Sequence, residues 1–329
     1  MNLTDRISRR KSISYIGLGL FALSTPFRRG RAQCHAQQPE GGACRLSLAQ
    51  WSLHRMHFGG KLDTLNFPAF VKEHFAIGAV EYVNQFFKDK ANNQTYLSEL
   101  KRRCDDHGTR SLLIMCDQEG MLGALLKNDR IRAVENHYKW VEAAQFLGCH
   151  SIRVNVLGTT TNSAELASCV VESLFALAAF SRDYGIAVLV ENHGGYSSNG
   201  KWLAEVIRRV NLPNCGTLPD TGNFCLVRDQ PTAEAVQKGA RLGACREVYD
   251  RYAGLEELLP YAKGLSAKTY DFDDQGDETS MDYRRIIRGL KAMDFDGHIG
   301  IEYDGYRWSE TEGVLKTKQL LTEIWCNEG

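Results

Sequence analysis

Three acidic residues in the second half of the chain each follow a short apolar run. Glu191 comes after Ile-Ala-Val-Leu-Val, Asp220 after Leu-Pro, and Glu302 after His-Ile-Gly-Ile. If these runs are neighbouring parallel strands, the three carboxylates meet at one end of the sheet. Carboxylates held close together repel one another, and a bound cation removes that cost. Oxygen ligands suit Mg²⁺ or Mn²⁺ better than zinc. We therefore predict that Glu191, Asp220 and Glu302 hold a divalent metal.

Two further residues near these positions could take part in proton chemistry. His193 stands two residues after Glu191, and Lys268 lies within the apolar run 264–269. Next to a substrate carbonyl, Glu191 and Glu302 are expected to move protons, while Lys268 and His193 stabilise the oxygen that becomes negative. The structural alternatives are an ion pair for Lys268 and an ordinary surface position for His193.

Three other side chains, in or after the apolar runs, are predicted to contact the substrate. They are Asn223, Glu81 and Trp51. The face of Trp51 could stack on a sugar ring, with packing in the core as the alternative for this aromatic residue.

The elements that must position these residues alternate along the chain. Short apolar or β-branched runs, each typical of a strand, occur at 46–51, 79–83, 111–116, 151–156, 186–190, 215–218, 264–269 and 298–301. Stretches with helical periodicity lie between most of them, at 95–107, 130–147, 164–184, 281–293 and 314–325. Eight strands, most followed by a helix, predict an α/β protein: a (β/α)8 TIM barrel forming one domain over residues 45–329. An open doubly wound sheet is the alternative, but the chain has no Gly-rich phosphate loop. The stretch 226–254 is expected to be a long polar connection with some helical character.

The first 32 residues differ from the rest of the chain in charge. They contain seven Lys or Arg and one acidic residue, leaving 33 basic and 39 acidic residues in the remainder. The pair Arg9-Arg10 precedes an apolar run at 13–23, which is shorter than the ~20 residues that a membrane span needs. This pattern resembles a twin-arginine signal peptide over residues 1–32. We expect export to the periplasm with no stable membrane span after processing, and an uncleaved anchor is the alternative.

The charge of the chain argues against one class of partner, and the spacing of its cysteines indicates whether they form disulfides. The acidic remainder has no electrostatic reason to bind polyanions, which argues against a nucleic-acid partner. The ten cysteines are scattered without a Cys-x-x-Cys pair, so we expect mostly free thiols.

Taken with these residues, the chain resembles the sugar phosphate isomerase/epimerase superfamily, whose members are xylose isomerase-like TIM barrels, and within it the exported bacterial members. The resemblance rests on Glu-Asn-His-Gly-Gly (191–195), Leu-Pro-Asp-x-Gly-Asn-Phe (218–224), Ser-Ala-Lys-x-Tyr-Asp-Phe (266–272) and Ile-Glu-Tyr-x-Gly (301–305).

The resemblance also implies a metal site with a particular set of ligands. In ketose epimerases of this superfamily a divalent metal is held by Glu, Asp, His and Glu from strands five to eight, and Glu191, Asp220 and Glu302 match the carboxylates. Ser266 or Lys268 stands in the region of the ligand histidine. Asn223 replaces a second histidine, three residues after the Asp.

These observations lead to one working hypothesis and two alternatives. The hypothesis is a metal-dependent isomerase or epimerase that acts on a small carbohydrate, a sugar or keto-sugar, by proton abstraction next to a carbonyl through an enediolate. A lyase or hydrolase of 3-keto-glycosides would use the same chemistry but expel a leaving group. A non-catalytic sugar-binding barrel is the second alternative, motivated by the two missing histidines.

Overall fold

The computed structural model describes residues 44–232 and 243–328. The barrel lies within the compact unit Gln38–Gly329. The predicted signal peptide, residues 1–32, lies outside the described residues.

Eight parallel strands form one curved sheet, in the order β6-β5-β4-β3-β2-β1-β10-β9. They are β1 (Leu46–Ala49), β2 (Ala79–Val83), β3 (Arg110–Cys116), β4 (Ser151–Val154), β5 (Ala187–Val190), β6 (Cys215–Thr217), β9 (Gly264–Thr269) and β10 (His298–Tyr303). Each overlaps one of the eight predicted apolar runs, with β3 beginning one residue earlier and β10 ending two residues later than predicted, so the predicted (β/α)8 fold is confirmed.

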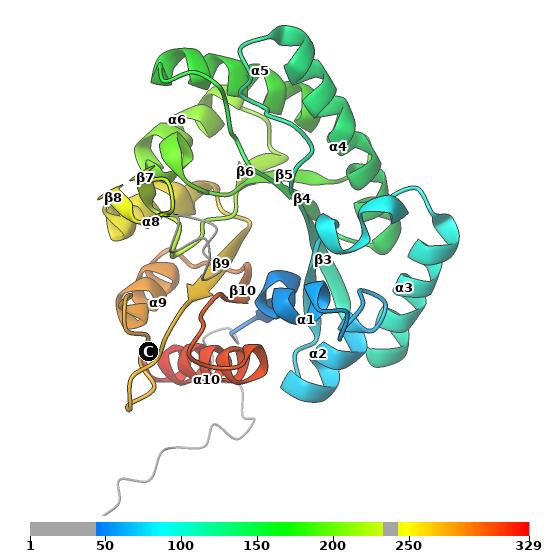
Figure 1. Ribbon diagram of the computed structural model, residues 1–329, viewed down its shortest axis with the longest axis vertical. Helices are drawn as coiled ribbons and strands as arrows, with labels where there is room; N and C mark the ends of the chain where they lie inside the picture. Colours follow the sequence, from blue (N-terminus) through cyan, green and yellow to red (C-terminus); the bar gives the residue numbers. More distant parts are fainter. Residues whose placement is uncertain (1–43, 233–242, 329) are drawn as a thin grey trace, which may run out of the picture. The chain divides into compact units, whose positions relative to one another are not determined.

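Helices surround the sheet, as Figure 1 shows. The α-helices are α1 (His54–Phe58), α2 (Phe67–Phe75), α3 (Gln94–His107), α4 (Lys127–Leu147), α5 (Ser163–Arg182), α6 (Gly200–Val210), α8 (Arg251–Leu258), α9 (Tyr283–Ala292) and α10 (Glu310–Asn327). Short 3-10 segments follow the strands or helices at η1 (Gln50–Leu53), η2 (Asn84–Lys90), η3 (Gly195–Ser198) and η4 (Leu259–Tyr261).

The barrel closes between β6 and β9 through backbone hydrogen bonds. The amide of Lys263 donates to the carbonyl of Thr217 (3.1 Å), and the amide of Ser266 donates to the carbonyl of Pro219 (2.8 Å). The amide of Thr221 donates to the carbonyl of Ser266 (3.0 Å), and Asp220 and Ser266 form a parallel bridge. The seam therefore passes through two residues whose side chains also meet at the site described below.

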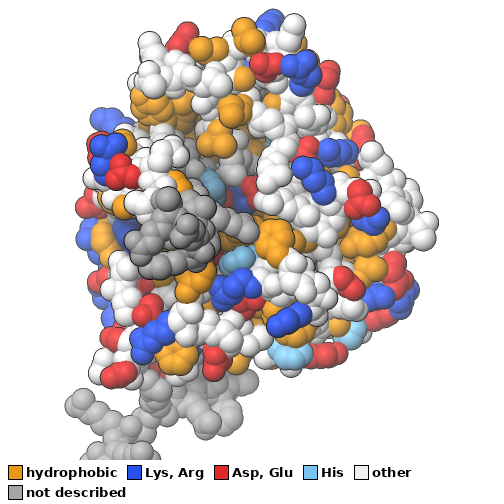
Figure 2. Space-filling model, in the orientation of Figure 1, with side chains coloured by type: hydrophobic (Ala, Val, Ile, Leu, Met, Phe, Trp, Pro, Cys, Tyr) orange, Lys and Arg blue, Asp and Glu red, His pale blue; other side chains and the backbone are white. Residues whose placement is uncertain are grey.

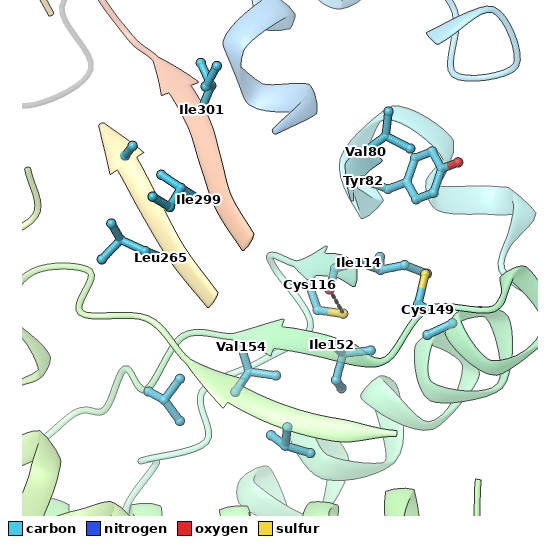
Figure 3. Close-up of a cluster of buried hydrophobic side chains, with 14 of the residues drawn as sticks. Val80, Tyr82, Ile114, Cys116, Cys149, Ile152, Val154, Leu265, Ile299 and Ile301 are labelled. Atoms are coloured by element: carbon cyan, nitrogen blue, oxygen red, sulfur yellow. Dashed lines mark hydrogen bonds between the residues drawn. The ribbon is translucent and has the colours of Figure 1, made fainter. Parts of the chain in front are cut away.

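Apolar side chains pack on both faces of the sheet, because successive residues of a strand point to opposite sides. On β3, Ile114 and Cys116 face the helices and belong to the large cluster drawn in Figure 3. Their neighbours Leu113 and Met115 belong to a separate, smaller cluster. That smaller cluster is completed by Ala49, Val83, Leu189 and Leu218, each from a different strand or strand end, and it fills the inside of the barrel.

The stretch expected to be a polar connection contains a two-stranded antiparallel sheet, β7 (Cys225–Arg228) and β8 (Cys245–Val248). A disulfide joins Cys225 to Cys245. Most side chains of both strands are exposed, so the segment lacks the apolar pattern that would have predicted strands. Among the described residues of this stretch, 226–232 and 243–254, the only helical ones are those at the start of α8. The expectation of mostly free thiols agrees with the thiols of Cys44, Cys104, Cys116, Cys149, Cys169 and Cys215.

Helix α5 is long and apolar enough to cross a membrane by length and composition. Its apolar face is nevertheless buried within the protein, through Leu166, Val170, Leu174 and Leu177. These contacts make α5 a core helix of the barrel.

Candidate active site at the end of the barrel

Four charged side chains gather at the carboxyl ends of the last four barrel strands. Glu191 directly follows β5, Asp220 lies just beyond β6, Lys268 is on β9 and Glu302 is on β10. All four are at most 4% exposed. Lys268 and Glu302 are register partners across the two strands. The face of the molecule shown in Figure 2 is hollowed near its middle, and acidic and basic side chains are visible in the hollow.

Two polar residues join the three carboxylates into one chain of contacts. The side-chain amide of Asn223 donates to Glu191 Oε1 (2.8 Å), and its backbone amide donates to Asp220 Oδ1 (3.0 Å). The hydroxyl of Ser266 lies 2.7 Å from Asp220 Oδ2 and 3.1 Å from Glu302 Oε2. The structure thus brings Glu191, Asp220 and Glu302 together around shared hydrogen-bond donors.

The turn that carries Asp220 is fixed by its neighbours. Asn192 accepts from the Asp220 amide (2.7 Å) and donates to the carbonyls of Asp220 (3.0 Å) and Asn223 (3.1 Å). A Cβ on Gly222 would stand 2.7 Å from Cγ of Lys268 and 2.6 Å from the Tyr270 hydroxyl. Only glycine therefore allows the turn to approach the Lys268 side chain this closely.

Two buried cations neutralise the carboxylates. The ammonium of Lys268 is in direct contact with Glu302 Oε1 and lies 3.6 Å from Asp220 Oδ2. On the opposite side, Arg153 on β4 places Nε 2.8 Å from Glu191 Oε2 and Nη1 2.6 Å from Asp117 Oδ1. Buried charges of both signs are thereby paired, as burial requires.

These surroundings shift the pKa values in different directions. Burial, together with Glu191 and Glu302, outweighs Lys268 and raises the pKa of Asp220 to about 7. Burial would raise the pKa of Glu302 as well, but the touching ammonium lowers it below its ordinary value. Burial would lower the pKa of Lys268, but Asp220 and Glu302 hold it well above its ordinary value. At neutral pH the site therefore contains an ionised Glu302, an ammonium at Lys268 and a partly protonated Asp220.

A fourth carboxyl lies beneath this group. Glu81 Oε1 accepts from the hydroxyl of Ser47 (2.6 Å), and both oxygens pass over Gly300, where a Cβ would stand 2.6 Å from Oε1. Burial, supported by Glu302, raises the pKa of Glu81 to about 7. With 2% of its surface exposed, Glu81 lies in the barrel interior below the predicted substrate position.

The remaining predicted residues lie around the site. His193 is exposed and is an electrostatic neighbour of both Asp117 and Glu302, which places it near the two carboxylates. Trp51 is half-buried in η1, stacked on His54 at 4.9 Å between ring centroids and 6.2 Å from Phe86. The side-chain amide of Asn223, predicted to contact the substrate, donates its hydrogen bond to Glu191.

Sequence reasoning missed Arg153. It stands within the apolar strand Ser-Ile-Arg-Val. A charged residue inside a buried strand is a signal that could have identified it, because a buried guanidinium must pair with a carboxylate.

The residues as placed do not fit the predicted Mn²⁺ or Mg²⁺. Such an ion needs several oxygens free to point at one centre. Here all six oxygens of Glu191, Asp220 and Glu302 already contact a donor or cation of the protein, supplied by Asn223, Arg153, Gly222, Ser266 and Lys268. Within residues 44–232 and 243–328, no three His, Cys, Asp or Glu side chains are grouped to hold a metal ion. A bound divalent metal therefore stays a prediction from the sequence.

Comparisons with known proteins agree with this architecture. A family model described as "Xylose isomerase-like TIM barrel" matches residues 71–324. Among curated proteins, the C-glycoside deglycosidase alpha subunit of Arthrobacter globiformis is 30% identical over 53 residues. That match spans 16% of this chain and 14% of the subunit.

Three solved structures illustrate the fold similarity. A sugar phosphate isomerase/epimerase from Parabacteroides distasonis has a TM-score of 0.61 at 16% identity, covering 87% of this chain and 96% of that one. The 3-keto-D-glucoside 4-epimerase of E. coli has 0.60 at 12% identity, covering 79% and 94%. The IOLI protein, solved with a zinc atom, has 0.62 at 14% identity, covering 87% and 99%. At these identities the similarity shows the fold alone.

Proposed function

Because the chain belongs to the xylose isomerase-like TIM barrel family, we propose that it is an isomerase or epimerase of a sugar or keto-sugar. The reaction moves a proton on the carbon next to a carbonyl, through an enediolate intermediate. The observation that carries the proposal is the ammonium of Lys268 buried against Glu302, with Glu191 nearby across Asp220. A cation beside carboxylates is the arrangement that this chemistry needs.

Each charged residue has a role in this proposal. An ionised carboxylate, Glu302 or Glu191, removes the proton from carbon, and the electron pair of the C–H bond moves onto the carbonyl oxygen. The ammonium of Lys268 donates a hydrogen bond to that oxygen as it becomes negative. The other glutamate, which starts protonated, returns its proton to that carbon as the electron pair moves back from the oxygen, so the substrate leaves with its composition unchanged. The two carboxyl groups regain their starting protonation by exchange with solvent. Arg153 and Asn223 hold Glu191 in position.

His193 and Trp51 are proposed to contact the substrate from above. The ring nitrogens of the exposed His193 imidazole can exchange hydrogen bonds with a sugar hydroxyl. The half-buried indole of Trp51 offers an apolar face to the ring.

Solvent exchange tests the proposal across this whole class of substrates. The protein is incubated in D₂O with a panel of keto-sugars and 3-keto-glycosides, and deuterium at the carbon next to the carbonyl is followed by NMR. We expect exchange with at least one substrate, and loss of it in Glu302→Gln. Absence of exchange and of product across the panel would instead favour the sugar-binding barrel.

A second candidate is a lyase or hydrolase of 3-keto-glycosides. It is favoured by the short similarity to the C-glycoside deglycosidase alpha subunit. It uses the same proton abstraction, after which the enolate expels a group from the neighbouring carbon. The products separate the two candidates, because an epimerised 3-keto-glycoside keeps its aglycone and an eliminated one loses it.

Export to the periplasm is also proposed. It is supported by the basic, twin-arginine leader and by the Cys225–Cys245 disulfide, a bond typical of oxidising compartments.

A further inference from the structure

The space between Asp220 and Glu302 is filled by a side chain of the protein itself. Lys268 reaches it from β9, touching Glu302 and standing 3.6 Å from Asp220 Oδ2. The hydroxyl of Ser266, on the same strand, links the other pair of oxygens. An added divalent ion at this point would lie against an ammonium and would have to displace it.

Both oxygens of the third carboxylate, Glu191, are also in contact with side chains of the protein. Glu191 has Arg153 on one oxygen and Asn223 on the other. Arg153 is itself anchored at its other end by Asp117, 2.6 Å away, so its departure would leave the buried Glu191 and the partly buried Asp117 without their cation. Both cations are at most 5% exposed and are held by β4 and β9 rather than by mobile loops.

We propose that the ammonium of Lys268 takes the place of a divalent metal in this barrel, so that the site stabilises the negative oxygen of its substrate with a fixed organic cation and works without metal. The catalytic part of this inference rests on the proposed function. Its main test, the binding of Mn²⁺, does not depend on that function. The step needs no other reactant. A carboxylate takes the proton from carbon, the electron pair moves to the carbonyl oxygen, and Lys268 hydrogen-bonds that oxygen. The other, protonated carboxyl then returns a proton to carbon as the electron pair moves back.

Metal titration tests this inference directly. Chelator-treated full-length protein is titrated with Mn²⁺ by calorimetry and by electron paramagnetic resonance of the free ion. We expect the unchanged protein to bind no Mn²⁺ up to millimolar concentration. Lys268→Met frees the oxygens of Asp220 and Glu302 and is expected to gain one bound Mn²⁺ per chain. The double variant Lys268→Met with Glu302→Gln should lose that gain, which locates the ion.

Lys263→Met is the matched control, because Lys263 is exposed just before β9. It should bind no more Mn²⁺ than the unchanged protein. Stoichiometric Mn²⁺ binding by the unchanged protein would overturn the inference, as would a folded Lys268→Met variant that binds none. If Lys268→Met does not fold, the Mn²⁺ titration of the unchanged protein still tests the inference.

Activity gives a separate readout. We expect deuterium exchange on the keto-sugar panel to be unchanged by chelation, whereas loss on chelation and recovery with Mn²⁺ would contradict the inference. A protein that neither exchanges deuterium nor binds Mn²⁺ would refute the proposed function and leave the replacement of the metal by Lys268 standing.

Discussion

The ammonium of Lys268 touches the carboxylate of Glu302, and the two residues are also register partners on β9 and β10. The sheet itself therefore fixes the pair. Because both groups are buried, removing one leaves the other without its partner, which costs more than the pair contributes. Changes at this pair are expected to affect catalysis and stability together, so the folding of a variant of the pair is measured together with its activity.

Replacing Glu302 by Gln removes the ionised carboxylate while keeping its shape. We expect turnover of the keto-sugar substrate to fall by about 10²–10⁴-fold, the usual contribution of an acid–base group. Lys268 still lies 3.6 Å from Asp220, so circular dichroism should show a folded barrel. Glu135→Gln, an exposed position on α4, is the control. Undiminished turnover in Glu302→Gln would remove Glu302 from the mechanism.

Glu81 is expected to make the free energy of unfolding depend on pH. Its pKa is raised from 4.5 to about 7, so the folded protein binds this proton more tightly than the unfolded chain. The stabilisation is complete below pH 4.5 and is lost as the pH rises through 7. The difference corresponds to about 3 kcal/mol at most.

Urea denaturation at about pH 5 and about pH 8, on either side of that transition, measures this effect. The unchanged protein should lose more stability over that interval than Glu81→Gln, whose neutral amide does not titrate. Comparing the two cancels the other titrating groups, such as His57, whose pKa burial lowers to about 4. Equal losses in both proteins would show that Glu81 is already ionised at the lower pH.

Replacing Arg153 by Met leaves Asp117 and Glu191 without their shared cation. We expect a loss of about 3–5 kcal/mol in the free energy of unfolding, as for other broken buried ion pairs. Arg153→Lys keeps the charge but cannot reach both carboxylates, so an intermediate loss is expected. Thermal and urea denaturation report both values. A Met variant as stable as the unchanged protein would indicate that the two carboxylates take up protons instead.

The Cys225–Cys245 disulfide closes a segment of 20 residues just after Asn223. Closing a loop of this size stabilises a protein by about 3 kcal/mol. Reduction should therefore lower the melting temperature of the unchanged protein. The double variant Cys225→Ser with Cys245→Ser should melt at that lower temperature with or without reductant. If reductant lowers both melting temperatures equally, another bond is responsible.

The twin-arginine signal can be tested by a charge-preserving change. Arg9→Lys with Arg10→Lys keeps the charge but alters the arginine pair that the export signal requires. We expect the unchanged protein in the periplasmic fraction of a producing bacterium and the double variant in the cytoplasm. The matched control is Arg28→Lys with Arg29→Lys, outside the pair. Export of both variants would exclude the twin-arginine route.

The strands and the positions of the site carboxylates could be predicted because both are local properties of the chain. Short apolar runs mark β5, β6 and β10. Glu302 lies within β10, Glu191 follows β5 directly, and Asp220 is the third residue after β6. The pairing of β7 with β8 could not be predicted, because their side chains are mostly exposed and the disulfide that joins them connects residues 20 positions apart.

The sequence by itself determined a parallel barrel with acidic residues at the carboxyl ends of its later strands. Strand periodicity and the order of residues at a strand end are local properties of the sequence, so both could be predicted from it. Only the tertiary structure decided which charges neutralise one another. Arg153 meets Glu191, and Lys268 enters the space between Asp220 and Glu302, because barrel closure brings β4, β5, β6, β9 and β10 around one centre. The sequence specifies which residues are charged, but the interaction between buried charges depends on the distances between them. Those distances are set only when the strands have closed into the barrel.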